Sequence, residues 1–162
     1  MLTNSRQAYH QHDHKRCIDA ALHRAKILCD ERRARLTPIR EAVFKTIWTS
    51  HRPLGAYDIV DRLTLDTSPV KRILPPTVYR SIEFLLEHGL IHRLASLNAY
   101  IGCPFPGSDH DDVFLICRAC GSAAECSADY LNTAVTQTAE RANFQVESQV
   151  IEIVGLCPEC LL

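Results

Sequence analysis

The sequence of 162 residues contains no apolar run that approaches the ~18 residues needed to cross a bilayer. Its opening residues, MLTNSRQAYHQHDHKR, contain no apolar stretch of the kind that forms a secretory signal. Glycine and proline are also scarce, at 6 and 8 residues, which excludes a collagen-like chain. With 46% hydrophobic and 23% charged residues, the length fits one domain or two small ones. We therefore expect a folded cytoplasmic protein with no membrane partner.

Basic residues are scarce in the second part of the chain. From Ala99 onward there are 2 Lys/Arg against 9 Asp/Glu, whereas the residues through Asn98 contain 16 Lys/Arg against 10 Asp/Glu. The overall net charge of −1 therefore hides a net charge of +6 in one part and −7 in the other. This split predicts two modules with different electrostatic roles, of which only the first suits a polyanion.

The basic part predicts several short helices followed by a hairpin. Residues 1–14, with His10, His12 and His14, are expected to form a disordered tail that is either solvated or binds metal loosely. Apolar spacing, Pro and Gly signals then predict four helices and two strands. The helices cover about 18–28, a segment from Pro38 after Thr37, Ala56–Leu65 and Pro75–Gly89, and the strands cover Leu90–Leu94 and Ala99–Cys103.

The fourth predicted helix has two distinct faces. One face is apolar, whereas the other combines Thr77, Arg80, Ser81 and Phe84. Short helices followed by a hairpin are the order of a winged helix-turn-helix, whose last helix before the hairpin enters the major groove of DNA. A small helical bundle with a solvated basic face is the alternative that this pattern leaves open.

The acidic part predicts a small α/β unit. A continuous apolar run predicts a buried strand over Val113–Cys117, and a second strand follows near Ala123–Cys126. Ser127 is expected to cap a helix that ends at Asn143, and alternation over 144–150 predicts a third strand. The inward stripe of that helix is expected to consist of Leu131, Ala134, Val135, Thr138 and Ala142.

Two CxxC pairs give the clearest chemical signal in the sequence: Cys117-Arg-Ala-Cys120 and Cys157-Pro-Glu-Cys160. Two residues between thiolates allow both sulfurs of a pair to reach one ion, and two pairs complete a tetrahedral Cys₄ zinc site. A redox dithiol is the main alternative, but it favours a CxxC that opens a helix, which neither pair is predicted to do. The four cysteines therefore predict structural zinc.

A second set of residues lies near the same strands: His92, Cys103, His110, Glu125 and Cys126. Each of these residues alone is expected to be a packing residue or a solvated one. Together, however, one thiolate, two imidazoles and a carboxylate form a mixed ligand set that zinc accepts. A deaminase-like zinc enzyme would require His-x-Glu, which the sequence does not contain. An enzyme is therefore the weakest hypothesis, and no small-molecule substrate is expected.

Beyond these patterns, the sequence resembles the ferric-uptake-regulator superfamily of bacterial metal-sensing repressors, and most closely its zinc-uptake branch. The resemblance covers about residues 25–160. It is carried by Arg35-Leu-Thr-Pro-Ile-Arg40, Ala56-Tyr-Asp58, Pro75-Pro-Thr-Val-Tyr-Arg80, Glu83-Phe-Leu-Leu-Glu87, Asn98-Ala-Tyr-Ile-Gly-Cys103 and the two CxxC pairs. The Pro-Pro-Thr-Val-Tyr-Arg string combined with paired CxxC motifs is its most specific part.

The resemblance implies an α+β chain: a winged helix-turn-helix DNA-binding domain over 15–97, a hinge over 98–104 and an α/β dimerisation domain over 105–162. It implies two zinc ions per chain, a structural one on Cys117, Cys120, Cys157 and Cys160 and a regulatory one on His92, Cys103, His110 and Glu125. Tyr57 and Arg80 fall where the family contacts DNA, and Thr77 and Ser81 join them as candidates. The implied function is a homodimeric, zinc-responsive repressor that binds operator DNA of zinc homeostasis genes.

Some alternatives remain open within this resemblance. The iron-sensing branch carries a His-rich run before the first CxxC, whereas His110 is the single histidine of that stretch here, which favours zinc over an iron or peroxide sensor. The neighbouring Asp109, Asp111 and Asp112 are possible replacements for His110 or Glu125 as oxygen ligands. A zinc-dependent thiol redox switch is a further alternative. Cys17, Cys29 and Cys126 are expected to be packing residues.

Overall fold

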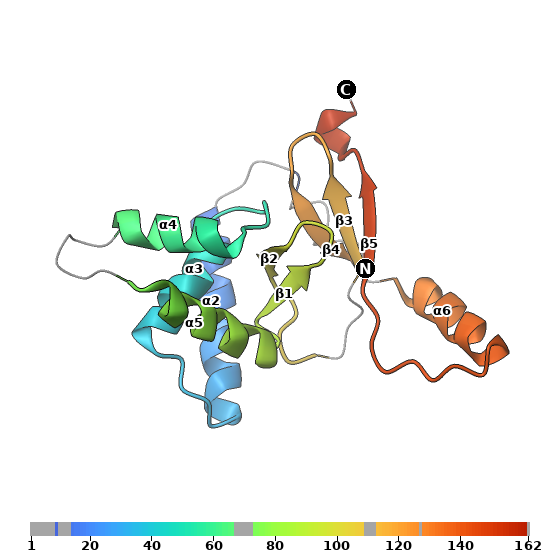
Figure 1. Ribbon diagram of the computed structural model, residues 1–162, viewed down its shortest axis with the longest axis horizontal. Coiled ribbons are helices and arrows are strands. Elements are labelled where there is room, and N and C mark those ends of the chain that lie inside the picture. Colours follow the sequence, from blue (N-terminus) through green and yellow to red (C-terminus); the bar gives the residue numbers. More distant parts are fainter. Residues whose placement is uncertain (1–8, 10–13, 67–72, 109–112, 127, 162) are drawn as a thin grey trace. The chain divides into compact units, whose positions relative to one another are not determined.

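The computed structural model describes residues 9, 14–66, 73–108, 113–126 and 128–161 (Figure 1). The chain forms two compact units, one of residues 11–108 and the other of residues 109–162 together with 1–10. Among the described residues, no helix combines the length and the apolar character that crossing a membrane requires. The expected α+β class is confirmed, since both units combine helices with short strands.

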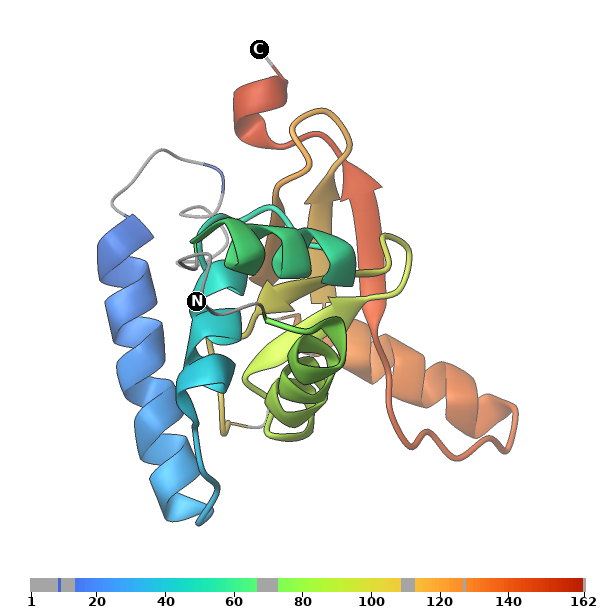
Figure 2. The same cartoon turned by 60° about the vertical axis from the view of Figure 1, so that its left-hand side comes forward.

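The first unit is built around a central helix. Its elements are α2 (His14–Glu31), α3 (Pro38–Ile47), α4 (Ala56–Asp66), α5 (Pro75–Glu87), β1 (Ile91–Leu94) and β2 (Ala99–Gly102). Helix α3 contacts α2, α4, α5 and β2, and lies between α2 and α5 in the view of Figure 2. Val43, Phe44 and Ile47 of α3 are buried together with Ile59, Val78, Ile82 and Leu85 of its neighbours. These periodic apolar positions explain why the short helices are stable only as one packed group.

The hairpin β1–β2 forms the wing of this unit. Its strands pair antiparallel from Ile91 opposite Gly102 to Leu94 opposite Ala99, and Asn98 takes a positive φ of 46° in the turn. Leu54, which precedes α4, exchanges both backbone hydrogen bonds with Tyr100, at 2.9 and 2.8 Å. This bridge ties the wing to the helices.

Helix α5 begins and ends as the sequence predicts. Pro75 occupies its first turn, and Gly89, at a φ of +64°, makes the left-handed exit that an L side chain would strain. Its predicted polar face is partly wrong, however. Ser81 is buried and its hydroxyl donates to the carbonyl of Thr77, at 2.8 Å, and Phe84 is also buried. Both side chains face the helical core because α5 is covered on more than its apolar stripe.

The second unit contains β3 (Val113–Cys117), β4 (Ala123–Cys126), α6 (Asp129–Arg141), β5 (Ile151–Gly155) and the 3₁₀ turn η1 (Pro158–Cys160). The strand order is β4-β3-β5, with β3 antiparallel to β4 and parallel to β5. Central strand β3 is almost entirely buried, as its continuous apolar run predicts.

The predicted third strand of this unit is wrong in position. Residues 144–150 form no strand, and β5 begins at Ile151, directly after the alternating segment. The predicted inward stripe of α6 is also wrong, because no residue of α6 is buried. Alternation and helical spacing report only that one face is apolar, and here the described chain does not cover that face. Ser127 lies outside the described residues, and Ala128 occupies the N-cap position.

Candidate metal centre and nucleic-acid interface

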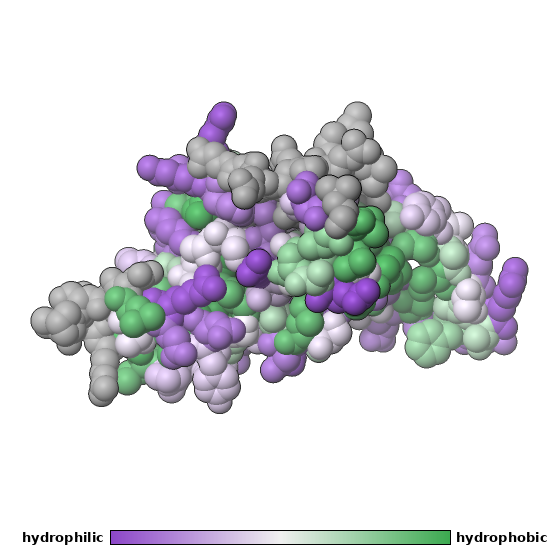
Figure 3. Space-filling view, turned by 90° about the horizontal axis from the view of Figure 1, so that it is seen from above, coloured by the Kyte–Doolittle hydropathy of each residue, from purple (hydrophilic) through white to green (hydrophobic). Residues whose placement is uncertain are grey.

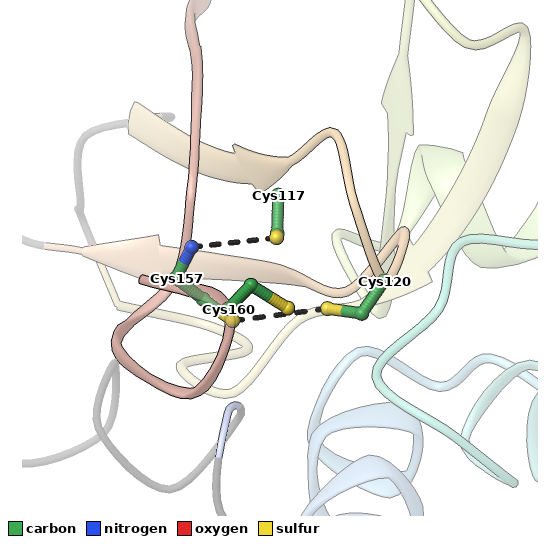
Figure 4. A group of neighbouring side chains, drawn as sticks. All are labelled: Cys117, Cys120, Cys157 and Cys160. Atoms are coloured by element: carbon green, nitrogen blue, oxygen red, sulfur yellow. Dashed lines mark hydrogen bonds between the residues drawn. The ribbon is translucent and has the colours of Figure 1, made fainter. Parts of the chain in front are cut away.

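The two CxxC pairs come together at one edge of the sheet of the second unit. Cys117 ends β3, Cys157 follows β5, and these parallel strands run side by side, so their carboxyl ends meet. Cys120 and Cys160 follow within the next turns. All four sulfur atoms lie within 4.8 Å of one another, and Figure 4 shows the four side chains converging from the two loops. The spacing alone predicted this grouping.

Hydrogen bonds define the shape of this cysteine cluster. The backbone N–H of Cys157 donates to Sγ of Cys117 at 3.3 Å, and Sγ of Cys120 lies 3.8 Å from Sγ of Cys157 (Figure 4). Backbone N–H groups of Cys120 and Cys157 lower the pKa of Cys117 to about 6, because they stabilise its thiolate. The hydrogen bond with Cys157 and burial raise the pKa of Cys160 to about 12.

The lowered pKa of Cys117 and the raised pKa of Cys160 indicate that the cysteine cluster requires a cation to hold all four sulfur atoms as thiolates. One thiol ionises readily, but a full set of thiolates so close together repels itself unless a cation lies among them. Four sulfur donors from two CxxC pairs fit the tetrahedral coordination that zinc adopts in structural sites. All eight cysteines are free of disulfides. Cys157 opens only the single 3₁₀ turn η1, unlike the α-helix that a redox CxxC favours.

Tyr9 is a residue near this cluster that the sequence did not single out. Its hydroxyl donates to the carbonyl of Leu115 on β3 at 2.7 Å. Burial raises the pKa of Tyr9, and the nearby Cys157 and Cys117 raise it further. The segment 1–14 is expected from the sequence to be a disordered tail, yet Tyr9 has this defined contact.

His14, the last residue of that predicted tail, begins α2, and its ring centroid lies 4.8 Å from that of His51. No periodic apolar pattern precedes Ile18, so neither contact could be predicted from the sequence.

The predicted regulatory ligands belong to elements of both units. In the first unit, His92 lies on β1 and Cys103 directly follows β2, with its N–H donating to the carbonyl of Leu90 at 3.1 Å. The alternation of side chains along paired strands places His92 and Cys103 on the same face of the hairpin. In the second unit, Glu125 lies on β4 opposite Phe114 and is 6% exposed. His110 and the neighbouring Asp109, Asp111 and Asp112 lie outside the described residues.

The other cysteines have different surroundings. Cys29 is buried in the core of the first unit, which confirms its expected packing role. Cys17 and Cys126 are half-buried. Burial, together with the neighbouring Glu125, raises the pKa of Cys126.

An exposed polar surface lies at the start of α4 and on α5. Tyr57 is 78% exposed, and Thr77 and Arg80 are exposed on α5. Tyr79, which the sequence did not single out, lies among them. Partial burial raises the pKa of Tyr79, and its hydrogen bond with the Tyr57 side chain raises it further. The predicted candidates Tyr57, Thr77 and Arg80 are therefore accessible to a ligand, whereas Ser81 is not.

Comparison with known proteins identifies the family. The model of the ferric uptake regulator family matches residues 31–154. The chain belongs to this family. The expectation that the chain is a regulator and no enzyme agrees with this membership. The zinc uptake regulation protein of Escherichia coli K12 is 35% identical over 141 residues, which cover 86% of this chain and 81% of that protein.

Solved structures of zinc uptake regulators resemble most of the chain. A zinc uptake regulator complexed with zinc and DNA is 30% identical and aligns with a TM-score of 0.79 over 93% of this chain and 97% of that one. Holo XcZur is 34% identical and aligns with a TM-score of 0.77 over 89% of this chain and 98% of that one. The winged-helix and α/β architecture described above is therefore that of this family.

Proposed function

We propose that this member of the ferric uptake regulator family is a zinc-responsive transcriptional repressor of the cytoplasm. In this proposal it binds operator DNA as a homodimer and controls genes of zinc uptake and homeostasis. The observation that carries the proposal is its similarity along nearly the whole chain to a regulator solved with zinc and DNA. The exposed Arg80 and Tyr57 and the Cys₄ cluster give that similarity a chemical basis in this chain.

In this proposal the unit of residues 11–108 reads DNA through α5. A helix in the major groove presents side chains to base edges, where an Arg guanidinium donates two hydrogen bonds to guanine. Arg80 is the candidate for that role, while Thr77 and Tyr57 fix the register by contacts to the backbone. Replacing Arg80 by Ala is then expected to cost about 1–3 kcal/mol and to relax the sequence preference at one base pair.

The second unit supplies the dimer interface. Apolar side chains are exposed on α6, on the segment that follows it and on the edge strand β5: Tyr130, Phe144, Val146, Val150, Ile153 and Val154. Figure 3 shows apolar residues on the surface in the region where Figure 1 places α6. Together with the position of β5 at the edge of the described sheet, such a surface suits a second copy of this chain.

Two zinc ions per chain have separate roles in the proposal. The Cys₄ ion stabilises the fold of the second unit, as closed structural sites do. The regulatory ion binds His92, Cys103, His110 and Glu125, two residues from each unit. Binding at this site selects the arrangement of the two DNA-reading units that matches the operator half-sites. Because the linkage is reciprocal, operator DNA must tighten zinc binding by the same factor.

The experiment that tests the proposal is zinc counting combined with a DNA titration at buffered free zinc. We expect two zinc ions per chain and an operator affinity that follows occupancy of the weaker site. Replacing Cys103 by Ser should weaken the zinc-dependent affinity and leave a folded dimer, with Cys126→Ser as the control. An operator affinity independent of zinc would overturn the proposal.

Two further measurements test the alternative functions. Titration with Fe²⁺ and Mn²⁺ in place of zinc tests the iron or peroxide sensor. Disulfide mapping after mild oxidation tests the redox switch.

A further inference from the structure

An arginine of α3 contacts an aromatic side chain of helix α5. The Cζ atom of Arg40 lies 3.7 Å from the centroid of the Phe84 ring, within the range of a cation–π contact. Nη1 of Arg40 also donates to the carbonyl of Arg35 at 2.6 Å. The guanidinium is therefore fixed by the ring and by the backbone that leads into α3.

A second arginine engages the end of the same helix. Nη1 of Arg32 donates to the carbonyl of His88, the C-cap of α5, at 3.1 Å. A cation at this position also interacts favourably with the helix dipole. The His88 ring packs against Phe84, with the two ring centroids 4.2 Å apart. We call Arg32, Arg40, Phe84 and His88 the arginine clasp.

We infer that Arg40 is a positioning residue for DNA recognition, acting through Phe84 on the orientation of α5. This inference rests on the proposed DNA-binding function. Phe84 lies four residues after Arg80, on the next turn of the same helix, so a shift at Phe84 moves the guanidinium of Arg80 with it. Base readout requires side chains to be held to within about 0.5 Å and 10–20°.

Two of the positive charges of the first unit are used inside the protein. Charge counting alone would assign Arg32 and Arg40 to contacts with the DNA backbone. In the structure, both guanidinium groups bind the protein's own carbonyls, and Arg40 also contacts an aromatic ring. A phosphate contact and a positioning contact differ in their salt dependence, because each phosphate contact releases counterions and contributes about one unit to the salt slope.

The test uses the zinc-loaded, full-length protein and a duplex that the wild type selects from a random library. Affinities for this duplex and for an unrelated duplex are measured across a range of salt concentrations for Arg40→Met, Arg40→Lys and Lys45→Met. Lys45 is the matched control because it lies on the same helix and pairs only with Glu41 among the ion pairs described. Unfolding followed by Trp48 fluorescence shows that each variant is folded at the temperature of the titration.

We expect Arg40→Met to lose about 10-fold in affinity for the selected duplex, as a misplaced base contact does, with little loss on the unrelated duplex. The salt slope should stay at the wild-type value. Arg40→Lys should not restore affinity, since an ammonium group lacks the planar surface that stacks on Phe84. Phe84→Leu should cause the same loss, and the double variant with Arg40→Met should be no worse than either single variant.

Other outcomes overturn the inference. Equal losses on both duplexes with a salt slope reduced by about one would make Arg40 a phosphate contact. Unchanged affinity for the selected duplex would exclude any role in recognition. If Arg40→Met does not fold, Phe84→Leu removes the ring on which the Arg40 guanidinium stacks instead, and the same pattern is expected of it. Failure of the wild type to select any sequence would be a failure of the proposed function and not of the clasp.

Discussion

Gly102 packs directly against the indole of Trp48, so that a Cβ atom built on it would lie 2.2 Å from Cε2 of that ring. The contact joins the last residue of β2 to the end of α3. It therefore fixes the wing on the helices at the residue before Cys103. A side chain at position 102 forces the indole or the strand to move.

We predict that Gly102→Ala lowers the free energy of unfolding of the first unit by about 1–3 kcal/mol, the usual cost of overpacking a filled site. Trp48 is the single tryptophan of the chain, so urea unfolding followed by its fluorescence reports on this unit. Gly155→Ala is the control, because a Cβ there would meet nothing within 4 Å. A Gly102→Ala variant as stable as the control would show that the indole moves aside freely.

The cysteine cluster gives a second prediction. Replacing Cys117 by Ser removes the thiolate that two backbone N–H groups stabilise and, in the proposed function, opens the closed structural zinc site. We expect the variant to lose one zinc ion per chain and the second unit to unfold. Zinc content and far-ultraviolet circular dichroism measure the two effects, and Cys126→Ser, in the same unit, should retain both. Full zinc content in Cys117→Ser would place the structural ion elsewhere.

The exposed apolar surface of the second unit gives a third prediction. Val154 is 59% exposed on edge strand β5. In a dimer that covers this strand, Val154→Glu would bury a charge without compensation, which should weaken dimerisation by about 10- to 100-fold. Light scattering after size exclusion measures the change in mass. Ile27→Glu, at an exposed apolar position of α2, should remain dimeric, and a Val154→Glu dimer of unchanged affinity would exclude β5 from the interface.

Glu41 gives a prediction about pH. Its carboxylate lies 2.6 Å from Nζ of Lys45 and 3.2 Å from Nζ of Lys26. The hydrogen bond with Lys45 lowers the pKa of Glu41, and Lys26 lowers it further, against the smaller opposing effect of burial. A pKa lowered by folding contributes stability above the unfolded value of about 4.3, and this stability is lost as the pH falls through the folded value.

Glu41→Gln should therefore reduce the stability of the first unit at pH 7 by at most about 0.5–1 kcal/mol, since both ion pairs are partly exposed to solvent. Once the pH has fallen below the lowered pKa of Glu41 in the folded protein, the variant and the wild type should be equally stable. Trp48 fluorescence in urea measures both, with Glu31→Gln as the control for loss of one exposed charge. A difference that persists unchanged at low pH would show that Glu41 acts by packing instead of by charge.

Local patterns predicted much of this protein. The four helices of the first unit, the hairpin and strands β3 and β4 follow from apolar spacing and from Pro and Gly signals, which act within a few residues. The Cys₄ cluster follows from spacing, because two CxxC pairs at the ends of neighbouring strands have few other arrangements. The motifs around Arg80 and the paired cysteines also predicted the family.

Other features depended on which surfaces the folded chain covers. The segment 144–150 alternates like a strand and α6 has an apolar stripe, yet β5 starts only at Ile151 and no residue of α6 is buried. Ser81 and Phe84 lie on a face of α5 that helical periodicity assigned to DNA, but the core of the first unit buries them.

The sequence by itself determined most of the local elements, the grouping of the four cysteines and the helix that presents Arg80. Only the tertiary structure decided what covers each face of an element: Arg40 on Phe84, Trp48 on Gly102 and Tyr9 at the carbonyl of Leu115. The physical reason is how far apart the interacting residues lie along the sequence. Helical and strand periodicity depend on neighbours a few residues apart, whereas these contacts join residues separated by tens of positions, whose meeting is set by the packing of the whole unit.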